Sequence, residues 1–406
     1  MAAPDQYILM PGCFDSKGEI FSFLRECLQD KGEQVLAINT GILGTTELFP
    51  VDIESDLVAA EAGVSITELR EKADRGYAVN IMGIGVAKMV ANLVAEGKVK
   101  AAIGMGGGGG TYITLSAMQE IPIGIPKLCI STIAAKDLTR QMGIKDIILM
   151  PSVVDIAGLN SISKRLINQA AAALCAMANE PVNDDNKPKG KIAISMFGNT
   201  TSCVDRCSKM LNNEGYEVFS FHATGVGGKT METLIREGHF DAVLDITTTE
   251  LADDLCGGVM SAGADRLTAA AEMGIPQVVV PGCLDMVNFA QRDTVPVHYQ
   301  SRDLYQWAPD VTLMRTNEAE NKILGQKLAQ KVNRSTAGAV ILIPLKGISQ
   351  ISTAGGVFYR PETDQLLFET IKNQVVDPVQ VIEIDAHIND PVFAESAVNS
   401  LLKLIK

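Results

Sequence analysis

The sequence lacks the clustered positive charge that binding to nucleic acids requires. Its 406 residues include 35 lysines and arginines against 48 aspartates and glutamates, which gives a formal net charge of −13. A protein that binds DNA or RNA needs a basic surface that neutralises phosphates. We therefore expect no nucleic-acid partner. An anionic ligand would have to be held locally, by backbone N–H groups and a few lysines.

Long apolar runs and export signals are also lacking. Apolar runs such as Val278–Val280 have the length of strands, and none approaches the roughly 18–20 residues that a membrane-spanning helix needs. The N-terminus carries Asp5 and enters an expected strand at Tyr7, with no basic segment followed by an apolar stretch. These features predict a cytoplasmic chain without a membrane partner.

The motifs of metal centres and hydrolases are missing from the sequence. The eight cysteines form no C-x-x-C pair, the four histidines have no zinc-protease spacing, and no G-x-S-x-G occurs. Cys203 and Cys207 lie four residues apart on an expected helix, where core packing explains them better than a metal does. We expect reduced structural thiols and no metal held by protein ligands alone.

Short apolar runs alternate with helical patterns along the chain. Each half opens with a strand that ends in glycine, and further expected strands are residues 34–38, 100–105, 127–130, 147–150, 216–221, 242–246, 277–280, 339–343 and 379–384. This alternation predicts an α/β fold of two Rossmann-like subdomains with mostly parallel sheets covered on both faces. In such sheets, ligands bind at the carboxyl ends of the strands.

A polar segment with two prolines, residues 181–190, divides the chain. It predicts a linker between an N-terminal subdomain, residues 1–180, and a C-terminal subdomain, residues 191–406. Both halves begin with the order strand, helix, glycine, strand and threonine-glycine, which is a weak internal repeat. Two similar domains predict a ligand cleft between them.

The strongest functional signal is a glycine run after the strand at 100–105, which reads Gly104-Met105-Gly106-Gly107-Gly108-Gly109-Gly110-Thr111. Consecutive glycines are entropically costly, and their N–H groups before an expected helix at 113–119 can cradle phosphate oxygens. A tight structural turn is the alternative. A dinucleotide site is not favoured, because no acidic residue follows about 20 positions later. The end of the run also resembles the glycine-glycine-aspartate-glycine-threonine loop of small-molecule kinases. Gly109 stands where that loop carries aspartate, which counts against a kinase.

Other loops add phosphate candidates. After the first strand, Asp15 or Ser16 could cap a helix, and Lys17 beside Gly18 could contact phosphate. A second segment resembles the end of a Walker A loop, but the first glycine of that motif would fall at Ala223. We expect a lysine-bearing anion site there rather than a true P-loop, formed by Gly227, Gly228, Lys229 and Thr230.

Hydroxyl and acid–base candidates lie at further strand ends. Ser131 and Thr132, and residues 247–250, could contact phosphate or sugar, or could cap helices. Asp155 and Asn160 follow another strand. Asp385 and His387 could form an acid–base pair or bind a metal, whereas a capping turn before Pro391 explains the neighbouring Asn389 and Asp390.

Taken together, these segments resemble a known family over essentially the whole chain. They are Gly12, Asp15, Lys17, Gly18 and Glu19, the glycine run, and residues 126–132, 153–160 and 385–391. They are similar to the uncharacterised microbial family that shares its domain with the N-terminal, ATP-binding part of the tomato mosaic virus resistance protein. The resemblance implies two Rossmann-like subdomains, a homodimer and ATP binding, with no established reaction. It further implies that loops 106–111 and 15–18, and Lys229, contact the nucleotide.

We therefore expect a nucleotide-binding protein that holds ATP phosphates on the glycine-rich loop. Magnesium is expected with a triphosphate because it neutralises clustered phosphate charge. Two alternatives stay open. One is an enzyme of sugar-acid or small organic-acid catabolism that uses the cleft, with Asp385 and His387 as acid and base, and holds a phosphorylated or carboxylated substrate on the same loop. The other is a non-catalytic interaction protein with a structural nucleotide. The sequence does not decide whether the chain is an enzyme.

Overall fold

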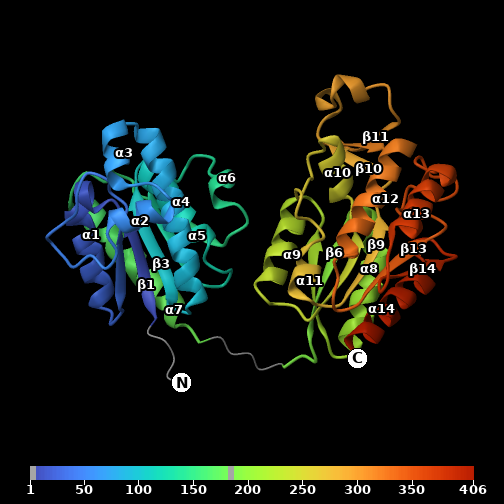
Figure 1. The fold of residues 1–406 in the computed structure, drawn as a ribbon, viewed down its shortest axis with the longest axis horizontal. Coiled ribbons are helices and arrows are strands. Elements are labelled where there is room, and N and C mark those ends of the chain that lie inside the picture. The colour runs from blue at the N-terminus through green and yellow to red at the C-terminus, as the bar shows by residue number, and fades with distance from the viewer. Residues whose placement is uncertain (1–5, 182–186) are drawn as a thin grey trace. The chain divides into compact units, whose positions relative to one another are not determined.

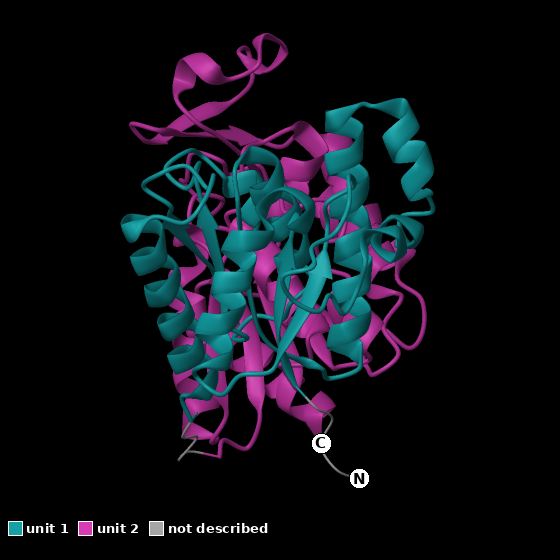
Figure 2. Cartoon of the chain, turned by 90° about the vertical axis from the view of Figure 1, so that its left-hand side faces the viewer, with its two compact units in different colours: residues 1–183 teal, residues 184–406 magenta. Residues whose placement is uncertain are grey.

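The computed structural model describes residues 6–181 and 187–406. The chain divides into two compact units, residues 1–183 (unit 1) and 184–406 (unit 2) (Figure 2). Residues 182–186 of the expected linker lie outside the described residues. Each unit is an α/β domain, and the predicted fold of two Rossmann-like halves with mostly parallel sheets is confirmed. The predicted cleft between the halves stays a prediction.

Unit 1 contains a five-stranded, fully parallel sheet in the order β2-β1-β3-β4-β5. Its strands match the short apolar runs of the sequence to within a residue or two. They are β1 (Tyr7–Gly12), β2 (Val35–Asn39), β3 (Val99–Gly106), β4 (Lys127–Ser131) and β5 (Ile147–Pro151). The central strands β1, β3 and β4 are almost entirely buried, because helices cover both faces of the sheet.

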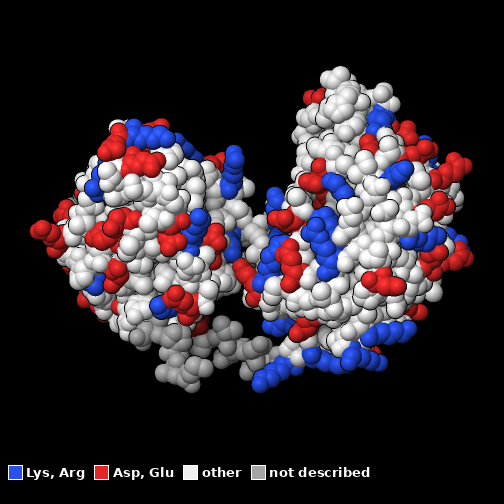
Figure 3. Space-filling model, in the orientation of Figure 1, with Lys and Arg blue, Asp and Glu red and all other residues white. Residues whose placement is uncertain are grey.

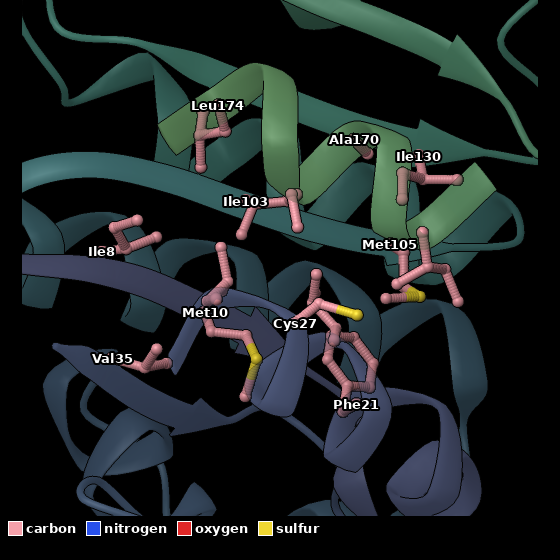
Figure 4. Packing of buried hydrophobic residues seen from close by; sticks show 14 of the residues in the cluster. Ile8, Met10, Phe21, Cys27, Val35, Ile103, Met105, Ile130, Ala170 and Leu174 are labelled. Carbon is pink, nitrogen blue, oxygen red and sulfur yellow. The ribbon is translucent and has the colours of Figure 1, made fainter. Parts of the chain in front are cut away.

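Two hydrophobic clusters hold these helices on the sheet of unit 1. One joins the strands to α1 (Phe14–Gln29) and α7 (Ser161–Asn179), and Figure 4 shows Phe21 of α1 and Leu174 of α7 turned toward the strand side chains. The other cluster, on the opposite face, contains α2 (Ser55–Glu61), α3 (Ile66–Lys72), α4 (Arg75–Ala95) and α5 (Gly108–Gln119). A short helix, α6 (Thr139–Met142), follows β4.

The strand order creates a switch point in unit 1. From β1 the chain crosses to β2 through α1 on one face, and from β2 it crosses back to β3 through α2, α3 and α4 on the other (Figure 1). The loops that follow β1 and β3 therefore diverge at the carboxyl edge. Open α/β sheets bind ligands at such a point.

Helix α4 is longer and more apolar than the sequence analysis expected of any segment. It has 21 residues and a mean hydropathy of 1.6 over its best window, so by length and composition alone it could cross a membrane. A core helix passes the same test, and in this fold α4 contributes residues such as Val86 and Val90 to the buried cluster.

Unit 2 repeats this topology and extends it by one strand. Its parallel sheet has the order β14-β13-β9-β8-β6-β7. The strands are β6 (Lys191–Met196), β7 (Glu217–His222), β8 (Ala242–Thr247), β9 (Gln277–Gly282), β13 (Ala339–Pro344) and β14 (Gln380–Ile384). In this order, β6, β7, β8, β9 and β13 occupy the positions that β1, β2, β3, β4 and β5 have in unit 1.

Helices also cover both faces of the sheet in unit 2. One face carries α8 (Thr201–Asn213) and α14 (Pro391–Ile405), and the other carries α9 (Val226–Arg236), α10 (Glu250–Cys256), α11 (Ala269–Met273), α12 (Glu318–Val332) and α13 (Pro361–Gln374). A small antiparallel sheet, β10-β12-β11, was not predicted. Its strands are β10 (Met286–Phe289), β11 (Leu304–Ala308) and β12 (Val311–Arg315). On the face shown in Figure 3, acidic and basic side chains lie interspersed across most of each unit.

Candidate functional site

A cavity of about 680 Å³ lies at the switch point of unit 1. This volume falls within the 300–1,000 Å³ typical of small-molecule sites. The carboxyl ends of β1, β2 and β3 form part of its wall, and α3, the starts of α1, α4 and α5, and Asp155 form other parts. Its charged lining residues are Asp15, Lys17, Arg70, Asp74, Arg75 and Asp155, and its apolar ones include Leu43, Leu69, Val79, Met82 and Ile113.

The glycine-rich loop forms the start of α5, several residues before the expected helix. Gly107 is the N-cap, no side chain caps the helix, and the first amide to bond back is that of Thr111, whose N lies 2.8 Å from Gly107 O. The first N–H groups of a helix have no acceptor within it. Gly107, Gly109 and Gly110 line the cavity, so the uncapped, partially positive end of α5 adjoins it.

The glycines of this loop serve two purposes. A Cβ on Gly104 would lie 2.7 Å from the Thr114 side chain, and one on Gly106 would lie 2.6 Å from Gly110 Cα, so both allow α5 to pack on β3. A Cβ on Gly107 would meet only Thr132 Oγ1, at 3.7 Å, and one on Gly108 would meet nothing within 4 Å. Packing explains the first two glycines. Packing does not explain Gly107 and Gly108, which leave open space at the start of α5.

The segment after β1 also reaches the cavity, but within the first turn of α1 rather than in a loop. Cys13 is the N-cap, and the first amide of α1, Phe14 N, donates to Asn39 Oδ1 at 3.3 Å, so the interpretation of Asp15 or Ser16 as a cap is wrong. Asp15 Oδ2 accepts a hydrogen bond from Leu43 N at 2.9 Å, and Lys17 Nζ donates to Ile156 O at 2.7 Å. Three of the four predicted residues, Asp15, Ser16 and Lys17, line the cavity; Gly18 does not.

The hydroxyls predicted to contact a ligand mostly brace the strand ends. Thr111 Oγ1 and Ser131 Oγ lie 2.7 Å apart, and both side chains are buried. They tie the start of α5 to the end of β4 and are not part of the cavity lining. Thr132 is exposed and also lies outside the lining.

In unit 2, the segment that resembles a Walker A loop forms the start of α9. Its amides already have an anion: Gly225 N and Gly228 N donate to Glu250 Oε1 at 2.7 and 3.1 Å. A Cβ on Gly227 would lie 1.9 Å from His222 O, so that glycine is needed for packing. The Thr230 hydroxyl donates to Val226 O, and Lys229 is exposed. The chain's own carboxylate therefore occupies the predicted anion position.

A buried ion network that the sequence did not reveal surrounds this carboxylate. Arg266 is fully buried and its Nε lies 2.6 Å from Glu250 Oε2. The same guanidinium pairs with Asp245 and Glu232. The hydroxyls expected to face a ligand after β8 are buried as well; Thr247 Oγ1, for example, lies 2.8 Å from Thr200 Oγ1.

The structure does not bring Asp385 and His387 together as an acid–base pair. The Asp385 side chain is 80% exposed and pairs with Lys346 at 3.0 Å. His387 Nε2 lies 2.9 Å from Ser349 O, and its Nδ1 accepts from Asn389 N. Within residues 6–181 and 187–406, no group of three or more potential metal ligands occurs. The interpretation of this segment as a turn fits better, since Asp390 is the N-cap of α14.

Two cavity residues, Arg70 and Arg75, were missed by sequence reasoning. Both come from the crossover between β2 and β3, where only the tertiary fold turns them to the site. Arg70 Nε donates to Ile42 O. The one local signal was Asp74, whose side chain accepts from Tyr77 N at 3.0 Å and marks the start of α4.

Comparisons with known proteins cover the whole chain. Residues 6–183 and 189–405 match the N-terminal and C-terminal domains of the Uncharacterised protein family (UPF0261). A UPF0261 protein of Clostridium tetani is 43% identical over 400 residues, 98% of this chain and 99% of that protein. One of Rhizobium meliloti is 40% identical over 96% of this chain and 97% of its own length.

A plant protein also matches. The ToMV resistance protein Tm-1(GCR237) of Solanum lycopersicum is 40% identical over 337 residues, 81% of this chain and 45% of that protein. Among solved structures, that of A-type ketoreductases from a modular polyketide synthase matches 94% of this chain and 89% of that one. Its TM-score of 0.23 and 12% identity support no argument.

Proposed function

The chain belongs to the UPF0261 family, whose activity is not established, and from that premise we propose that it binds a nucleotide, ATP, in the cavity of unit 1. One observation carries the proposal: the uncapped N-terminus of α5 adjoins a cavity of about 680 Å³ at the β1/β3 switch point. Free amides and the dipole at a helix start favour phosphate, and switch points are where such sheets bind ligands.

The lining of the cavity suits the parts of a nucleotide. Lys17, Arg70 and Arg75 supply positive charge for phosphates, and Leu69 and Met82 supply apolar surface for a base. Magnesium would arrive with the phosphates, because it is usually held by one or two carboxylates together with substrate oxygens. The carboxylates that line the cavity, Asp15, Asp74 and Asp155, would be the candidates to complete its shell.

The choice of ATP and the expectation of a homodimer rest on the family resemblance noted in the sequence, and the expectation of a cytoplasmic chain rests on its short apolar runs and its N-terminal sequence. The chain matches 45% of the tomato protein's length. The resistance that protein is named for is therefore not transferred to this chain, and the proposal extends only to the ligand.

Calorimetric titration of the full chain tests the proposed ligand. We expect saturable binding of ATP, strengthened by Mg²⁺, and weaker binding of sugar phosphates and small organic acids. Binding of the latter compounds alone would contradict the proposal and favour an enzyme of sugar-acid or organic-acid catabolism. Analysis of the bound nucleotide after incubation separates a substrate, which is consumed, from a structural ligand, which is recovered intact.

Gly107→Asp tests the location of the site. Aspartate is a favoured N-cap, so the variant should be at least as stable as the parent chain. Its carboxylate would occupy the amides of α5, as Glu250 occupies those of α9 in unit 2. We expect the affinity for ATP to fall at least about tenfold.

A matched control for this variant is Gly198→Asp. Gly198 is exposed in unit 2, where a Cβ would meet only Trp307, at 3.9 Å, so the substitution adds the same charge away from the cavity. It should leave ATP affinity unchanged. Equal affinities in all three proteins would remove the start of α5 from the site.

A further inference from the structure

The three cations of the unit 1 cavity differ in how they are bound. Lys17 Nζ is held by Ile156 O at 2.7 Å, and Arg70 Nε by Ile42 O. Arg75 is exposed and makes no hydrogen bond or ion pair with any residue in the described ranges. Its guanidinium therefore keeps its full set of donors, in the fork geometry that suits phosphate oxygens.

The packing of α4 on α5 places Arg75 beyond the start of α5. A Cβ on Gly109, in the first turn of α5, would lie 3.2 Å from Val79 Cγ2 of α4. Arg75 is four residues before Val79 and so shares its helix face. Because both helices follow the same direction back across the sheet, Arg75 stands about one turn, roughly 5.4 Å, further out than the first amides of α5.

The charge of Arg75 acts inside the cavity. Burial raises the pKa of the Cys13 thiol at the end of β1, and the positive charge of Arg75 is among the weaker effects that lower it. Cys13 also lines the cavity. Arg75 is therefore close enough to the end of β1 for its charge to act on Cys13.

Unit 2 contains an anion that is bound by helix amides together with an arginine. There the carboxylate of Glu250 is bound by the Gly225 and Gly228 amides at the start of α9 and by the guanidinium of Arg266. An anion is thus held by helix amides and one arginine. Unit 1 has the amides at the start of α5 and the guanidinium of Arg75. Where unit 2 has a glutamate carboxylate, unit 1 has a cavity.

We propose that Arg75 determines specificity by binding the outer phosphates of the nucleotide, so that the cavity selects triphosphates over monophosphates. The inference rests on the proposed function. A phosphate on the α5 amides leaves the next phosphates of the nucleotide to extend outward, toward a guanidinium that has no partner among the described residues. A monophosphate would end before it reached Arg75.

The test compares ATP, ADP and AMP binding to the full chain by calorimetry, for the parent protein and for Arg75→Gln. We expect the parent to prefer ATP over AMP, and Arg75→Gln to reduce this preference about tenfold, mainly by weakening ATP. Arg75→Lys keeps the charge but loses the fork, so it should restore part of the preference.

Arg165→Gln is the matched control. Arg165 is an exposed arginine of α7, on the other face of the sheet, and it too makes no hydrogen bond or ion pair with the described residues. It should leave the ATP-to-AMP ratio unchanged. If Arg75→Gln keeps the parent ratio, the role of Arg75 is overturned while the proposed function stands. If the parent binds none of the three nucleotides, the proposed function fails, and this inference fails with it.

Discussion

The two units share a strand order but treat the same edge of the sheet in opposite ways. In unit 1, β3 ends in glycines, and the helix start that follows adjoins a cavity. In unit 2, the equivalent strand β8 ends at Thr247 and leads to the buried Glu250, which binds the start of α9. The backbone of each unit presents helix amides at this edge. The side chains determine whether an external anion can reach them.

This difference separates a binding edge from a structural one. The carboxylate of Glu250 and the guanidinium of Arg266 form a buried ion pair. The free energy of this pair is offset in part by the desolvation of both charges. In unit 1 no carboxylate among the described residues binds the amides at the start of α5, so a ligand can fill that role. The two helix starts do not correspond in the topology, because α9 leads from β7 into β8 as α4 leads from β2 into β3, whereas α5 follows β3. The contrast is therefore between two helix starts at the carboxyl edges of the sheets, one bound by the fold's own carboxylate and one adjoining a cavity.

Removing Arg266 should break the comparison most severely. Arg266→Met would leave Asp245, Glu250 and Glu232 buried without their cation. We expect unit 2 to lose about 3–5 kcal/mol of stability. Urea unfolding followed by tryptophan fluorescence reports this directly, because the chain has one tryptophan, Trp307, and it lies in unit 2.

Arg236→Met is the control for that experiment. Arg236 pairs with Glu272 at 2.7 Å, and both side chains are at least one-third exposed, so its loss should cost no more than about 1 kcal/mol. Similar effects for the two variants would show that the buried network contributes no more than a surface pair.

The units should also respond differently to pH. Burial raises the pKa of Asp253 in unit 2 to about 7. The folded state then keeps a proton that the unfolded chain releases near pH 4, so stability falls as pH rises from about 4 to about 7, by up to about 1.4 kcal/mol per pH unit. In unit 1, burial of Asp146 acts to raise its pKa, but the hydrogen bonds with Lys127 and Gly124 and the charge of Lys127 together outweigh burial, so the pKa is lowered. That contribution is lost only as the pH falls through the lowered pKa.

Urea unfolding at pH 5, 6, 7 and 8 measures this contrast. The urea midpoint of the Trp307 fluorescence transition should fall as the pH rises. In Asp253→Asn the midpoint should depend less on pH, because position 253 no longer titrates. A parent midpoint that stays constant over this range would contradict the raised pKa of Asp253.

The smallest expected effects are on stability, and they distinguish a glycine of unit 1 that packing requires from one that it does not. Gly106→Ala would place a Cβ 2.6 Å from Gly110 Cα, and we expect it to cost about 1–3 kcal/mol. Gly108→Ala meets nothing within 4 Å, and should be neutral or stabilise unit 1 by up to about 1 kcal/mol. Calorimetric unfolding of the two variants measures the difference. Equal destabilisation would mean that packing requires both glycines.

Local patterns in the sequence were enough to predict the strands of the two parallel sheets. The strands of both units are short apolar runs that end at or near glycine, threonine or serine, and such runs are recognisable without tertiary information. Strands β10, β11 and β12 were missed because they are four or five residues long and interleave polar residues such as Asn288, Gln306 and Thr312. The pairing of β10 with β12 depends on contacts distant in sequence, whereas β11 and β12 form a hairpin that closes at Ala308 and Val311.

The candidate site could be predicted only in part, for a related reason. Lys17 and Gly107 follow strands directly, so the rule that ligands bind at carboxyl ends places them correctly. Arg75 reaches the cavity through the packing of α4 on α5. Glu250 reaches the Gly225 amide from 25 residues away. Neither position has a local signature, and this is why an anion was expected where the chain supplies its own.

The distribution of cysteines has a practical consequence. Seven of the eight are buried, and the one partly exposed thiol, Cys13, lines the unit 1 cavity. The sole tryptophan, Trp307, lies in unit 2. The unmodified chain therefore carries one addressable position for a fluorescent acceptor in one unit and one intrinsic donor in the other. Energy transfer between them would follow the separation of the units in solution, and no residue would have to be changed. Because a label on Cys13 would lie in the proposed nucleotide cavity, the measurement reports on the nucleotide-free chain.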